Sequence, residues 1–380
     1  MNKVVFLTGA TGLVGGNLIS QILKNDVTTE LILLIRGNSE VEAEQRLDKV
    51  PWKLSPEIDI SRVKERIKVI RGDITLNKLG LSESLYTRLA SEVTHIIHSA
   101  ASVKFQLPLE YAELVNFNGT KNVMALAKCA QEAGRLKRVA YISTAYVSGN
   151  RGGTILEAEL ECGQEFANTY EQTKFESEKF IRGLMKELPI TIFRPSIIVG
   201  DSKTGKTTAF NVLYLPLKLI YHQLIRILPG SRYTPIDVVP VDFVSRAINH
   251  ILLKTDEGIG KVYHLTAGER TATISGEIVD LAVDYFNQTG VKPYIPRIKF
   301  IPLKLYHTAK RLLNSRAKRV WQAIEVYEPY LGVKRTFDNT NTCLALQGTS
   351  IVPPHFGMYY QAILHYCIET NWGKGLRPAL

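Results

Sequence analysis

Short apolar runs recur along the first half of the chain, and each is followed by apolar positions at helical spacing. Residues 4–7 form the first run, and Leu18, Ile19, Ile22 and Leu23 follow it on one helical face. Continuous apolar runs of this length are typical of parallel strands buried on both faces, and their alternation with helices indicates an α/β fold with a doubly wound parallel sheet. Further strands are predicted at residues 31–35, 67–70, 93–98, 139–142 and 190–193.

The pattern changes beyond about residue 200. Residues 210–228 are long and mostly apolar, but Pro216 and a basic stripe of Lys218, His222 and Arg226 interrupt them. A membrane span needs about 20 predominantly apolar residues, so this stretch does not qualify as one. Its apolar positions predict one face of a single helix: Leu217, Ile220, Tyr221, Leu224 and Leu228.

A glycine-rich turn follows the first predicted strand directly. Gly9, Gly12 and Gly15 are spaced three residues apart between this strand and the first helix. Because glycine has no Cβ, the turn can tighten and the backbone can approach a pyrophosphate, whose charge the helix N-terminus stabilises. Glycine is common in tight turns of every kind, so it is the position between strand and helix that indicates a dinucleotide site in a Rossmann-type sheet. The expected cofactor contacts in this turn are Gly9, Thr11, Gly12, Leu13, Val14 and Gly15.

The residue after the second predicted strand indicates which nicotinamide cofactor binds. In NAD-specific folds an acidic residue there holds the ribose 2′-hydroxyl, whereas an arginine accommodates a 2′-phosphate. Arg36 occupies this position, so we expect NADPH; an exposed arginine at a strand end is the alternative. Arg46, on a helix predicted at residues 39–54, would be a second cation for the same phosphate or a solvated side chain.

Residues that follow the other strands lie at the same edge of the sheet, where a cofactor would bind. Asp73 would accept a hydrogen bond from an adenine amino group or serve as the N-cap of the next helix. Small residues from Ser99 to Ala101 would let the cofactor ribose and phosphates approach the backbone. The expected cofactor contacts at these strand ends are Asp73, Ile74, Ser99, Ala100, Ala101, Pro195, Ser196 and Ile197.

Tyr170 and Lys174 are spaced as Tyr-x-x-x-Lys on a predicted helix, and Thr144 follows the fifth strand. Residues i and i+4 share one helix face about one turn apart, and a lysine ammonium there would lower the pKa of the phenol toward neutrality. This spacing is common by chance on helix surfaces, but here it accompanies the glycine turn. The combination predicts that Tyr170, beside Lys174, is a usable proton donor or acceptor and that the Thr144 hydroxyl holds the substrate oxygen on the other side.

Composition and cysteine usage limit the class of protein. The chain has 380 residues, of which 45% are hydrophobic and 22% charged, as is ordinary for a soluble globular protein. The first strand begins almost at Met1, so we expect no signal or transit peptide. The four cysteines form no C-x-x-C pair, and the eight histidines show no metal-ligand spacing. We therefore expect a cytoplasmic protein with reduced thiols and no metal site.

The net charge of +11 indicates acidic partners. Residues 293–321 are basic and amphipathic, and they would meet an acidic carrier protein, the phosphates of coenzyme A or a membrane surface, the last as a peripheral contact. A solvated basic face is the alternative, since it needs no partner. The chain has no recognisable nucleic-acid-binding motif, so nucleic acid is not an expected partner.

Chain length predicts more than one domain, because a single core usually stops growing below 380 residues. Residues 1–200 would form the NADP-binding Rossmann domain, with returns to the sheet near residues 236–268 that include predicted strands at 235–242 and 262–265. Residues 201–235 and 269–380 would form a smaller, discontinuous, mainly helical substrate-binding domain. The last sixty residues show no recognisable chemistry.

Taken together, these motifs resemble the extended short-chain dehydrogenase/reductase superfamily over roughly residues 1–270. Within it, the chain is most similar to the thioester-reductase and fatty acyl-CoA reductase group, whose NAD-binding domain is of the male-sterility type. A short stretch at residues 336–341 also resembles the tail of fatty acyl reductases. The motifs are Thr8-Gly-Ala-Thr-Gly-Leu-Val-Gly15, Leu34-Ile-Arg36-Gly, His98-Ser-Ala-Ala101, Ile142-Ser-Thr-Ala-Tyr-Val147, Tyr170-x-x-x-Lys174 and Phe193-Arg-Pro-Ser-Ile-Ile-Val-Gly-Asp-Ser202, continuing into Lys203-Thr-Gly205.

The resemblance implies an NADPH-dependent oxidoreductase that reduces an acyl thioester, bound to coenzyme A or an acyl-carrier protein, to an aldehyde or an alcohol. Tyr170 would protonate the oxygen that gains charge, Thr144 would hydrogen-bond it, and Lys174 would hold the nicotinamide ribose and keep Tyr170 acidic. Residues 210–228 would line an acyl pocket, or pack as an ordinary helix. Many fatty acyl reductases are longer or fused to other domains, so this chain would receive its thioester from a separate carrier or as a coenzyme A ester.

Two other classes of function remain open from the sequence. The first is an extended-family dehydrogenase or reductase acting on a ketone, an aldehyde, or a sterol-like, flavonoid or nucleotide-sugar substrate. Nucleotide-sugar epimerases usually have an acid where this chain has Arg36. The second is a redox-sensing regulator that binds NADP(H) without turnover, a reading that usually accompanies loss of the tyrosine or lysine that this chain keeps.

Overall fold

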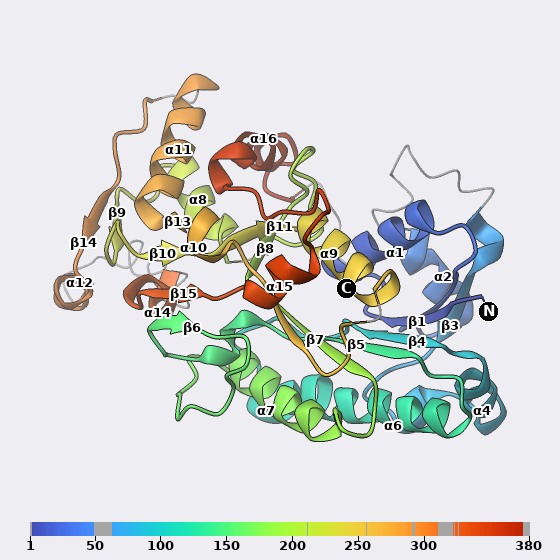
Figure 1. Ribbon diagram of the computed structural model, residues 1–380. Coiled ribbons are helices and arrows are strands. Elements are labelled where there is room, and N and C mark those ends of the chain that lie inside the picture. Colours follow the sequence, from blue (N-terminus) through green and yellow to red (C-terminus); the bar gives the residue numbers. More distant parts are fainter. Residues whose placement is uncertain are drawn as a thin grey trace.

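A seven-stranded parallel sheet is the centre of the computed structural model (Figure 1). The structure describes residues 2–48, 63–210, 212–255, 257–290, 293–310, 322, 324–325 and 327–374. The order of strands across the sheet is β12-β7-β5-β4-β1-β2-β3. Their bounds are β1 (Val4–Thr8), β2 (Glu30–Ile35), β3 (Ile67–Arg71), β4 (His95–His98), β5 (Arg138–Ile142), β7 (Ile190–Pro195) and β12 (Val262–Leu265).

Helices cover both faces of this sheet (Figure 1). One face packs against α1 (Leu13–Asn25), α2 (Glu40–Asp48) and α9 (Val241–Leu253). The other packs against α4 (Glu83–Glu92), α6 (Gly119–Glu132) and α7 (Thr169–Leu184). Because both faces are buried, the strands need the continuous apolar runs seen in the sequence. The predicted α/β class and Rossmann-type sheet are confirmed, and the strands predicted between residues 4 and 193 each lie within two residues of their observed bounds.

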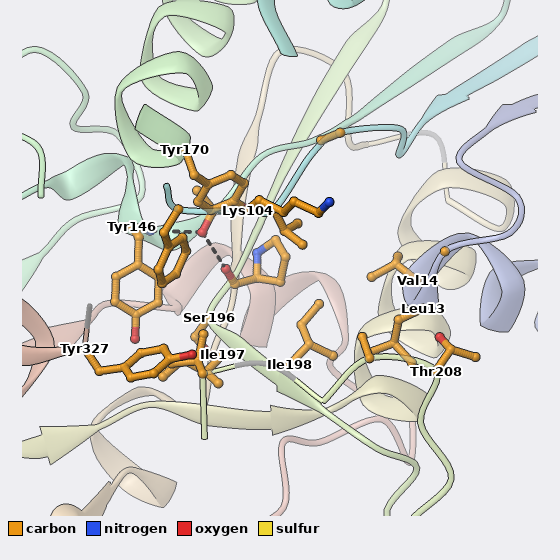
Figure 2. Close-up of a pocket in the computed structure, with 18 of the residues that line it drawn as sticks. Leu13, Val14, Lys104, Tyr146, Tyr170, Ser196, Ile197, Ile198, Thr208 and Tyr327 are labelled. Carbon is orange, nitrogen blue, oxygen red and sulfur yellow. Dashed lines mark hydrogen bonds between the residues drawn. The ribbon is translucent and has the colours of Figure 1, made fainter. Parts of the chain in front are cut away.

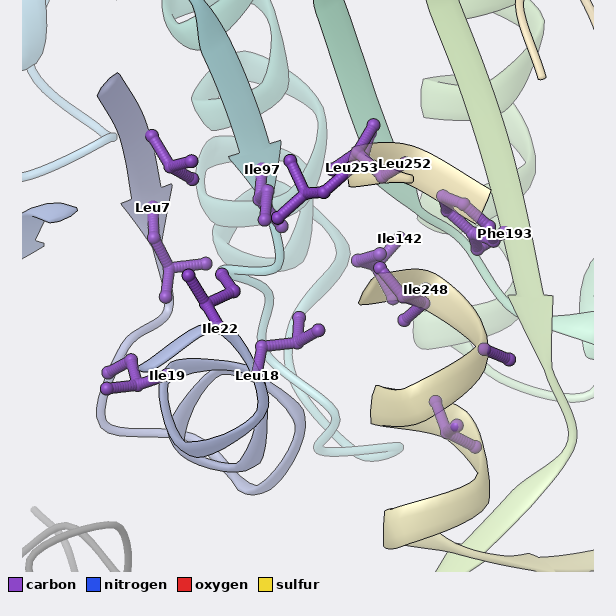
Figure 3. Close-up of a cluster of buried hydrophobic side chains, with 14 of the residues drawn as sticks. Leu7, Leu18, Ile19, Ile22, Ile97, Ile142, Phe193, Ile248, Leu252 and Leu253 are labelled. Carbon is purple, nitrogen blue, oxygen red and sulfur yellow. The ribbon is translucent and has the colours of Figure 1, made fainter. Parts of the chain in front are cut away.

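The core between α1 and α9 fixes the start of the chain against the sheet. Leu18 and Ile22 of α1 and Ile248 of α9 are fully buried, and Ile97 of β4 and Phe193 of β7 lie in the same cluster (Figure 3). Burying one hydrophobic side chain of this size stabilises the folded state by about 1.5–3 kcal/mol. The cluster therefore holds the β1–α1 turn in a fixed position at the end of the sheet.

The order of the strands reverses at β1, which lies between β2 and β4. In open parallel sheets, ligands bind in the crevice at the carboxyl ends of the strands where this reversal occurs. The glycine turn follows β1, and the segment 99–107 follows β4. The fold therefore places the predicted cofactor turn beside the segment after β4.

A second hydrophobic core lies beyond the carboxyl ends of β5 and β7. Its buried side chains come mainly from α8 (Tyr214–Tyr221), α11 (Ser275–Gln288) and α16 (Tyr360–Glu369). The division into two domains made from the sequence stays a prediction. The short strands of this region are β8 (Ile197–Val199), β9 (Ile227–Pro229), β10 (Pro235–Ile236), β11 (Val238–Pro240), β13 (Thr273–Ile274) and β14 (Lys299–Ile301).

Two predictions for this region are wrong in part. Residues 210–228 do not form one helix, because α8 ends at Tyr221, Gln223 has a φ of 56° and Leu228 lies in β9, which pairs with β14. Residues 235–242 do not return to the main sheet, because β10 pairs with β13 and β11 pairs with β8. The predicted strand at 262–265 is confirmed as the edge strand β12.

Residues 340–345 pack beside the main sheet, whereas residues 360–369 belong to the second core. Strand β15 (Arg335–Phe337) pairs with β6 (Gly153–Ile155), and α15 (Thr340–Ala345) packs beside β12. The buried carboxylate of Glu157 accepts hydrogen bonds from the backbone N–H groups of His264, at 2.7 Å, and Asn341, at 2.6 Å. Glu157 thus ties this segment to β12.

The remaining helical elements among the described residues are short. The predicted basic stretch at residues 293–321 is described only to residue 310, as β14 and α12, and residues 49–54 of the predicted second helix lie outside the described residues. No helix among the described residues is long and apolar enough to cross a membrane. The short helices and single turns are α5 (Leu109–Glu113), α10 (Gly268–Thr271), α12 (Leu303–Lys310), α14 (Glu328–Gly332), η2 (Lys64–Arg66), η3 (Asn77–Gly80), η4 (Leu114–Asn118), η5 (Ala145–Ser148) and η6 (Phe356–Met358).

Replacing Gly15 tests whether close packing at the glycine turn supports the fold. In Gly15→Ala the added Cβ would lie 2.2 Å from the Gly9 carbonyl oxygen, so the turn has to shift. We expect the free energy of unfolding to fall by about 1–3 kcal/mol, as for overpacked cores. The matched control is Gly183→Ala in α7, where a Cβ meets nothing within 4 Å and a gain of about 0.5–1 kcal/mol is expected. Equal effects of the two substitutions in thermal or denaturant unfolding would contradict this account.

Candidate active site

The turn between β1 and α1 has the geometry that a dinucleotide pyrophosphate requires. Gly9 has a φ of +76°, and a Cβ on it would lie 2.7 Å from the Ala100 backbone nitrogen. The N–H of Gly12 donates to the Gly9 carbonyl at 2.9 Å, which closes the turn. Gly12 is the N-cap of α1 and supplies no side-chain hydrogen bond, so the first N–H groups of the helix stay available for an anion. These residues therefore fit a phosphate-bearing cofactor.

The two predicted arginines meet at the end of β2. Arg36 is exposed immediately after this strand, and a guanidinium nitrogen of Arg46 donates to the Arg36 carbonyl at 3.2 Å. Because β2 is adjacent to β1, this pair lies on the β2 side of the glycine turn. No acidic residue occupies the position directly after β2, where a ribose 2′-hydroxyl would be bound.

Asp73 and Ile74 follow β3, on the outer side of β2. One carboxylate oxygen of Asp73 accepts hydrogen bonds from the N–H and the hydroxyl of Thr75, both at 2.9 Å. Asp73 therefore closes a local turn, and the prediction that it caps the next helix is wrong, since Leu76 is the N-cap there. Ile74 is buried, and its carbonyl accepts a hydrogen bond from Asn122 at 2.7 Å.

A cavity of about 1010 Å³ opens between the glycine turn and the ends of β4, β5 and β7 (Figure 2). Most of the predicted cofactor and catalytic residues meet in its wall. Gly9, Gly15, Arg36, Arg46, Asp73, Ile74, Ala100 and Lys174 do not line it. The predicted residues that line it are Thr11, Gly12, Leu13, Val14, Ser99, Ala101, Thr144, Tyr170, Pro195, Ser196 and Ile197.

Tyr170 enters the cavity from the first turn of α7. The helix begins there because the Asn168 side chain accepts the N–H of Glu171 at 3.0 Å. The hydroxyl of Thr144 donates to the Pro195 carbonyl at 3.5 Å and accepts the N–H of Tyr146 at 3.3 Å, which fixes its position next to Tyr170. Burial raises the pKa of Tyr170 to about 12, and the Thr144 hydroxyl partly opposes this shift. Tyr170 is thus a neutral phenol at physiological pH.

Lys174 lies one turn further along α7, as predicted, but it is buried behind the cavity wall. Its ammonium donates to the Ile142 carbonyl at 2.7 Å and lies 4.3 Å from the centre of the Tyr141 ring. Burial lowers the pKa of Lys174 to about 7. The expectation that Lys174 lowers the pKa of Tyr170 is therefore wrong for this arrangement, because burial dominates both groups and the ammonium points to a backbone carbonyl.

A buried ion pair holds α7 on the sheet. Glu178 and Arg194 are each almost fully buried, with a nitrogen–oxygen distance of 2.6 Å, and the Ser143 hydroxyl donates to the same carboxylate at 2.6 Å. Burial would raise the pKa of Glu178, but the guanidinium groups of Arg194 and Arg182 hold it below its usual range. The carboxylate is thus charged and joins α7, β5 and β7.

Ser196 and Asp237 form a second polar pair at the cavity wall. The Ser196 hydroxyl donates to the buried Asp237 carboxylate at 2.5 Å, and the same carboxylate accepts the N–H of Ala267 at 2.8 Å and of Gly268 at 3.2 Å. Burial raises the pKa of Asp237 to about 6. Because its proton is directed to Asp237, the Ser196 oxygen can act toward the cavity only as an acceptor.

Sequence reasoning gave no role to several residues that line the cavity, among them Lys104, Phe105, Tyr146, Tyr327 and Tyr330. Lys104 and Phe105 follow β4 and could have been found by the strand-end argument applied to Ser99–Ala101. Tyr146 lies within the motif at residues 142–147, but no role was predicted for its side chain. Tyr327 and Tyr330 come from the last sixty residues, and no local pattern connects them to the site. Figure 2 shows the Lys104 side chain extending from the Tyr170 end of the cavity toward Val14.

Comparison with known proteins shows which family has this arrangement. A family model described as male sterility protein, an NAD-binding family, matches residues 7–248. The fatty acyl-CoA reductase wat of Drosophila melanogaster is 28% identical and covers 65% of this chain and 53% of its own length. The non-canonical nonribosomal peptide synthetase FrzA of Cladobotryum sp is 28% identical over 90% of this chain and 34% of its own length. The match therefore spans about half the length of the Drosophila relative and about a third of the length of FrzA.

Solved structures share the fold over nearly all of the chain. The terminal R domain from the myxalamid PKS-NRPS biosynthetic pathway superposes with a TM-score of 0.80 at 26% identity, over 98% of this chain and 92% of that one. A dTDP-glucose 4,6-dehydratase from Bacillus anthracis in complex with NAD shares the fold, with a TM-score of 0.64 at 16% identity, over 99% of this chain and 100% of that one. The chain therefore belongs to the male sterility family of NAD(P)-binding proteins, oxidoreductases of the extended short-chain dehydrogenase/reductase superfamily.

Proposed function

We propose that this protein reduces an acyl thioester with NADPH. Addition of one hydride and one proton to the carbonyl gives a hemithioacetal, whose carbon–sulfur bond then breaks to release a thiol and an aldehyde. A second hydride and proton would convert the aldehyde to an alcohol. The observation that carries the proposal is one cavity that joins the glycine turn to Thr144 and Tyr170. The nicotinamide supplies the hydride when it is bound. The chain's own residues then have to bind the substrate carbonyl, neutralise its oxygen and exclude water.

Tyr170 is the proposed proton donor to the substrate oxygen. The phenol of Tyr170 is protonated at neutral pH, so it carries the proton that the reducing direction requires. Thr144 would donate its hydroxyl to the same oxygen, exchanging its long 3.5 Å bond to the Pro195 carbonyl. Lys174 would use the ammonium donors not directed at Ile142 to hold the nicotinamide ribose. Positioned proton transfer of this kind typically contributes about 10²–10⁴-fold in rate.

We propose NADPH as the cofactor, and the two arginines at the end of β2 support this choice. Arg36 is exposed after β2, and Arg46 reaches the Arg36 backbone from α2. Arginine binds phosphate oxygens with paired, charge-assisted hydrogen bonds. We assign Asp73 and Ile74 to the adenine side of the same site, since they follow β3 next to β2.

The proposed substrate is a thioester on coenzyme A or on an acidic carrier protein. The relatives support this class: one is named a fatty acyl-CoA reductase, and another is a terminal R domain of a PKS-NRPS pathway. Lys104 is exposed at the cavity and would meet a phosphate of the pantetheine arm. The net charge of +11 fits an acidic carrier, and it also fits a cytoplasmic protein with peripheral contact to an anionic membrane.

Tyr170→Phe tests the catalytic assignment. The substitution removes the proton donor and keeps the ring, so kcat for thioester reduction should fall by about 10²–10⁴-fold while the Kd for NADPH changes little. Steady-state kinetics and a fluorescence titration of NADPH measure the two quantities. The control is Tyr233→Phe, which alters a tyrosine that is 66% exposed and lies outside the cavity. Turnover of Tyr170→Phe at the parent rate would overturn the assignment.

Arg36→Ala tests the cofactor assignment. Losing charge-assisted hydrogen bonds of about 1.5–3 kcal/mol should weaken NADPH binding by about tenfold to a hundredfold and leave NADH binding unchanged. Isothermal titration with each cofactor gives the two dissociation constants. Arg88→Ala, on the exposed side of α4, is the matched control and should change neither. A parallel loss for NADH and NADPH would show that Arg36 does not contact the 2′-phosphate.

A further inference from the structure

Aromatic rings enclose the end of the cavity at Tyr170. The Phe105 ring centroid lies 5.9 Å from that of Tyr170 and 5.9 Å from that of Tyr330, with the second pair stacked. Tyr146 meets Tyr330 edge-on at 5.2 Å, and Tyr327 meets Phe105 edge-on at 6.3 Å. All five line the cavity. Figure 2 shows Tyr146, Tyr170 and Tyr327 together at one end of it, with Leu13, Val14 and Thr208 at the other.

This aromatic end is built from four separate segments that are tied together. The Tyr330 hydroxyl donates to the buried Glu171 carboxylate and accepts a hydrogen bond from Asn168 at 2.8 Å. The Thr169 hydroxyl donates to the Phe105 carbonyl at 3.3 Å. Asn168, Thr169 and Glu171 surround Tyr170 in the chain, so the start of α7 fixes the ring of Tyr330 and the backbone of Phe105.

Tyr146 is fixed by a different contact. The Arg335 guanidinium of β15 lies 5.5 Å from the centre of the Tyr146 ring, and Arg335 itself is buried. A cation over one face of an aromatic ring holds it in place. The Tyr330 and Tyr146 rings and the Phe105 backbone are therefore held in place before a substrate binds, and ordered walls lose little entropy on binding.

The two ends of the cavity differ in what they offer to an acyl group. At the glycine-turn end the side chains are aliphatic or small, including Leu13, Val14 and Ile198. At the reacting end, next to Tyr170 and Thr144, the walls are flat aromatic faces and edges. Aromatic pairs in offset or edge-on geometry gain about 0.5–1.5 kcal/mol beyond the burial of their area, which a saturated chain does not obtain.

We propose that this end of the cavity selects acyl thioesters with an aromatic or conjugated planar group within one or two bonds of the carbonyl. The inference rests on the proposed thioester reduction and adds its substrate class. The carbonyl has to lie at Tyr170, so a planar group attached close to it would lie between Phe105, Tyr327 and Tyr146. A saturated ring or chain of the same size is thicker and gains only burial.

Phenylacetyl-CoA and cyclohexylacetyl-CoA form a matched pair for the test. They have the same number of carbon atoms, and in neither is the carbonyl conjugated, so their chemical reactivity is similar. We expect kcat/KM to be about tenfold higher for phenylacetyl-CoA, the fold-change that corresponds to two aromatic contacts. The corresponding free aldehydes, tested in the same way, remove any dependence on the carrier.

Tyr327→Leu should abolish most of this preference. The Tyr327 hydroxyl has no hydrogen-bond partner among the described residues, so the change removes a ring and little else. Phe105→Leu is the second variant and should act in the same direction. Tyr233→Leu, at a tyrosine that is 66% exposed, is the control and should leave the ratio of the two substrates unchanged. Equal rates for the two compounds in the parent protein, or a preference that survives both variants, would overturn the proposal.

Binding measurements separate failure of this proposal from failure of the proposed function. Calorimetric dissociation constants for the two coenzyme A esters need no turnover. If neither ester nor aldehyde is reduced but the phenyl compound binds more tightly to the parent than to Tyr327→Leu, thioester reduction is wrong and the aromatic selectivity stands. If both compounds are reduced and bound equally well, reduction stands and the selectivity is wrong. If neither compound is bound or reduced, both proposals fail.

Discussion

The buried ion pair between Glu178 and Arg194 is the interaction on which the geometry of the site depends. Glu178 lies one helical turn beyond Lys174 and two turns beyond Tyr170 on α7. The ion pair that holds Glu178 against β7 therefore also determines where these two side chains meet the sheet. Removing one partner of such a pair leaves a buried, unpaired charge and costs about 3–5 kcal/mol. Ser143 shares the carboxylate, and Thr144 is the next residue. One charge cluster therefore aligns both proposed contacts to the substrate oxygen.

The C-terminal segment completes the site from the opposite direction. Tyr330 bonds to Glu171 beside Tyr170, Arg335 covers Tyr146, and Glu157 accepts N–H groups from β12 and the start of α15. A buried carboxylate needs such partners, because leaving it unpaired in a low-dielectric interior is costly. Tyr327 and Tyr330 of this segment thus line the cavity near Tyr170, and the proposed chemistry depends on residues far apart in the chain.

Local patterns predicted the sheet and the glycine turn, since apolar runs and missing β-carbons act within a few residues. The i, i+4 pair of Tyr170 and Lys174 was found for the same reason. The raised pKa of Tyr170 was not predicted, because it results from burial by Phe105 and its neighbours, which is a tertiary property. Tyr330 and Asp237 were missed because their partners lie 159 and 41 residues away. The helix predicted at 210–228 failed because Leu228 pairs in a strand with β14, a contact that no helical periodicity reveals.

The most direct test of thioester reduction follows NADPH oxidation by the purified protein and identifies the product. Acyl-CoA, an acyl-carrier thioester, the matching aldehyde, a ketone and a nucleotide sugar are compared under one set of conditions. The account predicts oxidation with at least one thioester, with one NADPH consumed for each aldehyde released or two for each alcohol. Activity on the ketone or the nucleotide sugar, with none on any thioester, would contradict it and assign the cavity to another reaction of the superfamily.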